Sequence, residues 1–208
     1  PLYQVSHLGG LFSSFNADIV GSTDFYKSGF PARYGGRLSS VVDVTTAPGD
    51  MYEYHGSFSI GLIDGRIQYE GPIVKGKTSF NMSLRRSWLD LVSTPALAIV
   101  NRKLKKEDNQ TINAGFNFND FNAGITHKFS EDNILRVNFY RGRDRLNTRI
   151  TDIENPYNPD TDSWDLDYED ISIIGGNMHW GNTLVSGVWK KNFSDRLSGQ
   201  TSAWYSRY

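Results

Sequence analysis

From about residue 53 to the end of the chain, apolar and small polar residues alternate with a period of two. In the first such segment Phe58 and Ile60 alternate with Ser57 and Ser59. Successive side chains of a strand point to opposite faces, so this pattern predicts strands with one apolar and one polar face. We predict seven strands, at residues 53–63, 66–73, 78–91, 114–129, 134–146, 177–191 and 196–208.

The connections between these predicted strands alternate between short and long. Residues 71–77, 130–133 and 192–196 are short turns, whereas residues 93–111 and 142–176 are long and polar. Bacterial outer-membrane barrels have short periplasmic turns and longer outer loops, so the alternation favours a barrel segment. Aromatic residues near the predicted strand ends fit the girdles at the two membrane interfaces. They are Trp88, Phe129, Phe139, Trp180, Trp189, Phe193, Trp204 and Tyr205.

Alternation alone is equally compatible with a soluble β-sandwich, whose strands also have one polar face. In a soluble sandwich the polar face usually carries Lys, Glu and Thr. Here the polar positions are rich in Ser, Asn, Gly and Gln with Arg interspersed, which suits a wet barrel lumen better. A soluble β-sandwich binding module and a passive outer-membrane porin both stay open as alternatives.

The number of predicted strands indicates that the chain is a piece of a larger barrel. Single-chain bacterial barrels have an even number of strands, and seven is odd. An eight-stranded barrel is filled by its own side chains, whereas one of about 22 strands holds a plug. The predicted fold is therefore all-β with a small α+β plug remnant. Residues 1–50 would be the end of the plug, and residues 51–208 the first seven or so strands of a large antiparallel transmembrane barrel.

Composition excludes several other classes of function. A net charge of −1 and a pI near 6.5 give no basic footprint for nucleic acid. The chain has no cysteine, which excludes disulfides and thiolate metal sites. Apolar stretches such as residues 96–100 are far shorter than the roughly 20 residues of a spanning helix, so a membrane crossing would use a barrel.

Residues 24–50 read DFYKSGFPARYGGRLSSVVDVTTAPGD and lead directly into the alternating strands. A predicted strand at residues 19–27 is followed by a Gly-rich excursion with Tyr34, Gly35 and Gly36, and then by a strand at residues 41–46. This segment resembles the junction between plug and barrel in TonB-dependent receptors of the bacterial outer membrane, and closely the Bacteroidetes branch. It departs from the SusC-type glycan importers, whose plugs end with an Ala-rich Tyr-Gly-Ser stretch and an Ile-Thr-Thr-Lys strand.

The resemblance implies an outer-membrane receptor that imports a scarce solute, such as a siderophore, haem, cobalamin or an oligosaccharide. Its partners would be outer-membrane lipid, the solute and the TonB–ExbB–ExbD energy-coupling complex, which pulls on an N-terminal box outside these residues. Residues 1–16 look like the apical loop of the plug, so the solute-contacting candidates are Tyr3, Gln4, Ser6 and His7. Tyr34, Gly35 and Gly36 form the plug signature, and we expect the two glycines to supply positive φ and close backbone approach.

We expect no enzymatic activity, catalytic residue, cofactor or metal. No nucleophile elbow or spaced carboxylate pair is present, and the four histidines have neither HxH nor HExxH spacing. The acidic segment 160–170 lacks the Gly and Glu of a calcium-binding EF-hand loop, which favours a solvated loop.

Five arginines near predicted strand ends leave several roles open. They could attract an anionic solute or lipopolysaccharide phosphates, snorkel, or pair with carboxylates in the lumen. They are Arg85, Arg86, Arg141, Arg143 and Arg145.

Overall fold

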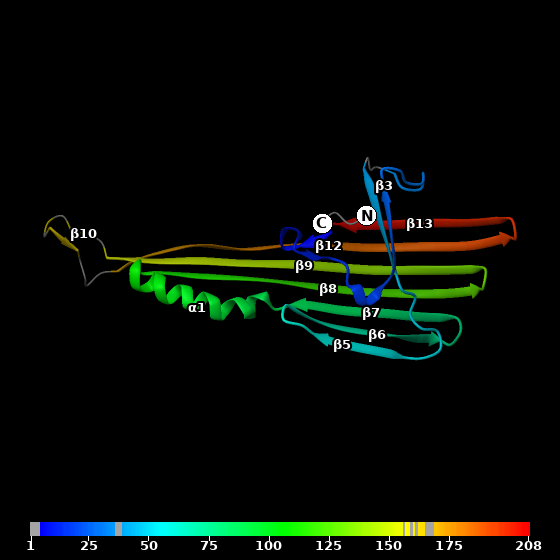
Figure 1. Ribbon diagram of the computed structural model, residues 1–208, viewed down its shortest axis with the longest axis horizontal. Coiled ribbons are helices and arrows are strands. Elements are labelled where there is room, and N and C mark those ends of the chain that lie inside the picture. Colours follow the sequence, from blue (N-terminus) through cyan, green and yellow to red (C-terminus); the bar gives the residue numbers. More distant parts are fainter. Residues whose placement is uncertain (1–4, 36–38, 156, 159, 161, 165–168) are drawn as a thin grey trace.

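The computed structural model describes residues 5–35, 39–155, 157–158, 160, 162–164 and 169–208, which are mostly β-strand. Seven antiparallel strands form one open sheet in the order β13-β12-β9-β8-β7-β6-β5 (Figure 1). They are β5 (His55–Ile60), β6 (Asp64–Val74), β7 (Thr78–Ser87), β8 (Gln110–Ser130), β9 (Asn133–Glu154), β12 (Asp170–Ser194) and β13 (Leu197–Arg207). The seven predicted strands are confirmed in number and order, and the all-β class is confirmed, with β5 and β13 as the two edges of the sheet. The predicted strand at residues 78–91 is too long, because β7 ends at Ser87 and a helix begins at Leu89.

The two faces of the sheet differ in chemistry, as the alternation predicts. On β7, Ser79, Ser83 and Ser87 are buried, whereas Met82 and Leu84 are 41% and 49% exposed. The pairing register places many apolar residues opposite apolar ones, and polar residues opposite polar ones, on neighbouring strands. One row on this side, half-buried to exposed, crosses five strands through Met82, Ala123, Phe139, Val185 and Tyr205. We call this exposed side the apolar face and the opposite side the polar face.

The N-terminal segment covers part of the polar face. It contains β1 (Ser6–His7), η1 (Leu8–Gly10), β2 (Phe12–Ser13), η2 (Ala17–Ile19), β3 (Val20–Lys27) and β4 (Ser40–Thr46). β1 pairs with β2, and β3 pairs with β4 in a hairpin that runs across the long strands in Figure 1. Within the described residues the buried hydrophobic side chains are Ile19, Phe116, Phe118 and Tyr140, so most of what the segment covers is polar.

A helix replaces part of the first long loop, and the prediction of a polar loop at residues 93–111 is wrong there. α1 (Leu89–Glu107) follows β7 and lies beside β8 (Figure 1). The Asn101 amide donates to the carbonyl oxygen of Ile112 (2.8 Å) and accepts from its N–H (2.7 Å). β7 ends opposite Asn119, so α1 covers the part of the β8 edge that β7 leaves unpaired. No described helix is long and apolar enough to cross a membrane.

The longest strands extend farther than the alternation predicts. β9 continues to Glu154 and β12 begins at Asp170, so the predicted loop at residues 142–176 is much shorter. Between them, β10 (Tyr157–Asn158) and β11 (Ser163–Trp164) form a small hairpin. β8 has 21 residues, about twice the 9–11 residues of a membrane-crossing strand. At about 3.3 Å per residue it is roughly 70 Å long.

Two of the predicted girdle aromatics lie on the polar face. Trp180 is paired in register with Asp144, and Trp204 with Ser186. Paired residues of adjacent strands share a face, so these two side chains point toward the side that the N-terminal segment covers. Trp189 and Tyr205 lie on the apolar face, in keeping with the prediction.

Candidate functional site

A buried polar cluster joins the N-terminal segment to the sheet. It consists of His7 from β1, Arg85 from β7, Asp120 from β8, and Tyr140 and Asp144 from β9, and we call it the His7 cluster. None of the five residues is more than 7% exposed. Charged side chains are almost never buried to this degree unless they are paired, so the cluster has a specific role in holding these elements together.

His7 is bound on both sides by carboxylates. Its Nδ1 is hydrogen-bonded to Asp144, and its Nε2 lies 3.1 Å from the Asp120 carboxylate. The imidazole is parallel to the ring of Phe118, with 4.2 Å between the ring centroids. Burial alone would lower the pKa of His7, but the hydrogen bonds and charges of Asp120 and Asp144 raise it to about 9. His7 is therefore a cation at neutral pH.

Asp120 is the residue that the other members share. Arg85 donates to it from Nη2 (2.6 Å) and Nε (2.9 Å), and the Tyr140 hydroxyl donates to its other oxygen (2.9 Å). Arg85 also donates to the backbone carbonyl of Ser13 in the N-terminal segment. With His7 protonated, two cations face two carboxylates, so the buried charge is balanced.

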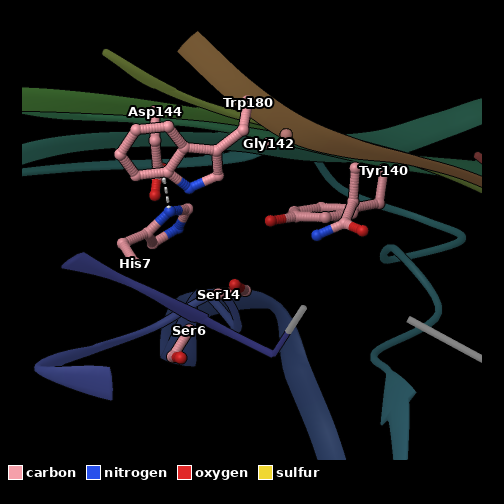
Figure 2. A pocket seen from close by; sticks show the side chains of 9 residues that line it. Ser6, His7, Ser14, Tyr140, Gly142, Asp144 and Trp180 are labelled. Carbon is pink, nitrogen blue, oxygen red and sulfur yellow. Dashed lines mark hydrogen bonds and ion pairs between the residues drawn. The ribbon is translucent and has the colours of Figure 1, made fainter. Parts of the chain in front are cut away.

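Three members of the cluster, His7, Tyr140 and Asp144, line a narrow pocket between β1 and the sheet (Figure 2). Ser6 and Ser14 line it from the N-terminal side, and Trp180 lines it from the sheet. Gly142 makes room for the cluster, since a Cβ there would lie 2.2 Å from the Tyr140 hydroxyl oxygen. Among the described residues nothing hydrogen-bonds to the Asp144 Oδ2 atom.

Further polar contacts fix the rest of the N-terminal segment to the same face. Asn16 donates to the hydroxyl of Ser83 (3.1 Å), and the Thr46 hydroxyl donates to Asn138 (2.8 Å). Arg136 donates to the Thr46 carbonyl (3.2 Å). The segment is therefore held on the sheet at points from residue 7 to residue 46, chiefly by hydrogen bonds and ion pairs.

Two residues of the predicted plug signature, Tyr34 and Gly35, lie between β3 and β4. The Tyr34 hydroxyl donates to Asp43 (2.5 Å) and accepts from Arg33 (2.9 Å). Burial and the neighbouring Asp43 raise the pKa of Tyr34 to about 12 although Arg33 opposes them. Gly35 has no positive φ, and no atom lies within 4 Å of where its Cβ would be, so the expectation for this glycine is wrong. Gly36 lies outside the described residues.

The four predicted solute-contacting residues have different positions. Tyr3 and Gln4 lie outside the described residues. Ser6 is paired with Ser13 and lines the cavity. His7 is buried with both ring nitrogens bound, so in this conformation it faces the sheet and not a solute.

Sequence reasoning missed Asp120, Tyr140 and Asp144. Each occupies a polar-face position of its strand, and a carboxylate at such a position signals a buried partner. Arg85 was among the arginines noted near strand ends, and of the roles left open for it the structure shows pairing with a carboxylate.

The other histidines are not gathered into a metal site. His55 lies 3.3 Å from Asp50, and His127 is hydrogen-bonded to Thr78 (2.8 Å). In the part of the chain that the structure describes, no three His, Cys, Asp or Glu side chains are arranged to hold a metal ion. Much of the acidic segment 160–170 lies outside that part.

The His7 cluster has the chemistry of an ionic anchor. Both imidazole nitrogens face carboxylates, so neither is placed to take a proton from a serine hydroxyl.

No protein-family model matches this sequence, and no curated protein or solved structure is significantly similar to it.

Proposed function

We propose that this chain is the plug-to-barrel junction of a TonB-dependent outer-membrane receptor that imports a scarce solute. The N-terminal segment is the end of the plug, and the seven-stranded sheet is the start of a wall of about 22 strands. The energy would come from the TonB–ExbB–ExbD complex acting on a part of the plug outside these residues.

One observation carries the proposal: the sheet is apolar where it is exposed and polar where it is covered. Phe58 and Ile60 are 79% and 77% exposed, whereas Ser79 and Asp120 are fully buried. A sheet in a water-soluble protein packs its apolar face inward. The reverse arrangement is expected when lipid surrounds the sheet and a polar plug fills the space inside it.

The nature of the contacts between the segment and the sheet also supports a plug. Hydrogen bonds and ion pairs, such as those of the His7 cluster, can exchange for water when the segment moves. A segment fixed by a large apolar core could not be displaced without exposing that core. The described interface therefore suits a body that must stay in place at rest and shift during import.

The two alternatives fit these observations less well. A soluble sandwich needs a second layer over the apolar face, and in the described residues that face is bare apart from its border with α1. A passive porin needs an open lumen, whereas here the N-terminal segment lies on the polar face, which would be the lumen side of a barrel.

The proposal is tested on the native polypeptide in cells of the source organism. An antibody against residues 28–50 should detect it in the outer-membrane fraction, at several times the 23.5 kDa of this chain. Deleting the TonB partner should abolish its energised solute uptake without changing its abundance there. A soluble product of about 23.5 kDa would contradict the proposal and favour the sandwich.

A further inference from the structure

We propose that the apolar face carries a binding site for the phosphate groups of an outer-leaflet glycolipid. The site lies at the upper border of this face, where "upper" means toward α1 along the strands. The site consists of Arg86, Arg141, Arg143, Arg145 and Arg207, which we call the arginine patch. The inference rests on the proposed function, because only in an outer membrane would this face meet such a lipid.

The pairing register places these five arginines together on one face. Arg86 and Arg143 are in one row, joined through Asn119 on the strand between them. Arg141 and Arg207 are in the row below, joined through Thr183. Arg145 lies one row above Arg143 on β9. Side chains two residues apart on a strand are about 7 Å apart, and neighbouring strands about 5 Å, so the patch matches groups of phosphate size.

All five side chains are exposed, and little in the protein neutralises them. Asp90 at the start of α1 lies 3.8 Å from Arg86. Among the described residues, no carboxylate forms an ion pair with Arg141, Arg143, Arg145 or Arg207. Between them lie Asn119, Gly181 and Thr183, which are short and uncharged.

Arg85 differs from the arginines of the patch, because it is buried and paired with a carboxylate. Arg85 is the neighbour of Arg86 in sequence but points to the polar face, where Asp120 pairs with it at 2.6 Å. On β9, Asp144 lies between Arg143 and Arg145 in sequence and likewise points away from the patch, toward His7. The carboxylates of these strands are thus spent on the polar face, and the opposite face keeps a net positive charge.

The position of the patch identifies the anion as part of a lipid. The row that contains Arg141 lies directly above the apolar row of Met82, Ala123, Phe139, Val185 and Tyr205. From the apolar row, this row lies toward the end of the sheet that has α1 and the connection between β9 and β12. The short turns are at the opposite end (Figure 1). Outer loops of bacterial barrels are the longer ones, so the patch is level with the outer-leaflet headgroups. The arginine guanidinium binds two phosphate oxygens at once. A soluble phosphate could make the same contacts, but it would lack acyl chains to anchor it beside the apolar row.

The test uses the full-length protein purified from its own outer membrane in mild detergent, with bound phosphorylated glycolipid measured by native mass spectrometry. The variant R141Q/R143Q/R145Q removes three charges from the patch. The control R149Q/K105Q/K106Q removes three charges from β9 and α1 farther from the apolar band. Each basic side chain near an anionic membrane surface adds to the free energy of lipid binding. We therefore expect at least about tenfold less bound glycolipid in the patch variant, and no change in the control.

Three outcomes would overturn the inference. Equal glycolipid on the patch variant and the control would show that the arginines do not hold it. Loss on both would show that charge in general, and not the patch, attracts the lipid. Binding of inorganic phosphate by the patch, with no glycolipid, would assign it to a soluble anion. Each result is distinct from failure of the proposed function, in which the protein would be missing from the outer-membrane fraction.

Discussion

At the scale of single residues, the His7 cluster links the N-terminal segment to the sheet through buried charges. Asp120 is fully buried and receives hydrogen bonds from Arg85 and Tyr140 while facing the His7 imidazole. The carboxylate thus compensates two cations that come from different parts of the chain. Losing it leaves buried positive charge with only Asp144 to balance it, which is the costly way to break such a network.

Replacing Asp120 with Asn should therefore weaken the docking of the N-terminal segment by about 3–5 kcal/mol. Limited proteolysis of the full-length protein in increasing urea would measure it, as cleavage within residues 5–35 at lower urea concentration. Asp195→Asn is the matched control, because this exposed turn residue carries the same charge away from the cluster. If both variants gave the wild-type cleavage profile, the cluster would not anchor the segment.

The raised pKa of His7 makes the docking depend on pH. A histidine has a pKa near 6.5 when the segment is detached and about 9 when it is docked. The proton thus favours the docked state. Its contribution is complete below pH 6.5 and is lost as the pH rises through 9. Proteolysis of the segment should accelerate over this range, and His7→Gln should remove the dependence. A variant with the same pH profile as wild type would contradict the assignment.

At the scale of elements, the strands were predictable and the helix was not. Alternation such as Phe58 and Ile60 against Ser57 and Ser59 reports the strand period directly. In α1, Pro95 lies inside the helix and breaks the expected pattern. The helix nevertheless continues through Pro95, and just before it the hydroxyls of Ser93 and Thr94 bond to the Asp90 carbonyl. The sequence near Pro95 therefore predicts a loop.

The candidate site was predictable only in part, for a different reason. His7 was singled out, but its partners Asp120 and Asp144 are 113 and 137 residues away along the chain. Strand period tells which face a residue occupies, and it correctly puts both carboxylates on the polar face. It does not tell which residue of another element lies opposite, because that depends on how the N-terminal segment docks.

The facing of the strands predicts opposite effects for neighbouring substitutions in β5. Ile60 lies on the apolar face, whereas Ser59 lies on the polar face opposite Arg66. Ile60→Asp should impair membrane assembly of the full-length protein much more than Ser59→Asp, since a lipid-facing charge costs about 2–4 kcal/mol at mid-depth for basic residues and somewhat less for acidic ones. Heat-modifiable mobility on gels would report assembly. Equal damage from the two variants would contradict the facing, and Ile125→Asp tests the same face on β8.

At the scale of the whole molecule, the sheet has two features that a water-soluble protein avoids. Its apolar face is exposed along β5 to β8, with Ile60 77% and Ile125 48% accessible. Its edge strands β5 and β13 have no partner within the described residues. Under the proposed function, lipid would cover this face and further strands would pair with these edges.

The 208-residue chain on its own should therefore self-associate in buffer and become dispersed only in detergent or lipid. Light scattering with and without a mild detergent would measure this. A stable monomer in buffer alone would favour the soluble sandwich.

The central claim is that the N-terminal segment is a plug that moves under TonB control, and the most direct measurement is the accessibility of the surface it covers. Because these 208 residues contain no cysteine, Ser83→Cys places one thiol among them, on the polar face beneath Asn16, and any cysteine elsewhere in the full-length protein would first be replaced by serine. A maleimide probe would be applied to cells that express the full-length variant, with and without the TonB partner. The account predicts rapid labelling only when TonB is present, and protection when Asn16→Cys is added and the two thiols are tethered. Labelling at the same rate in both strains would contradict it.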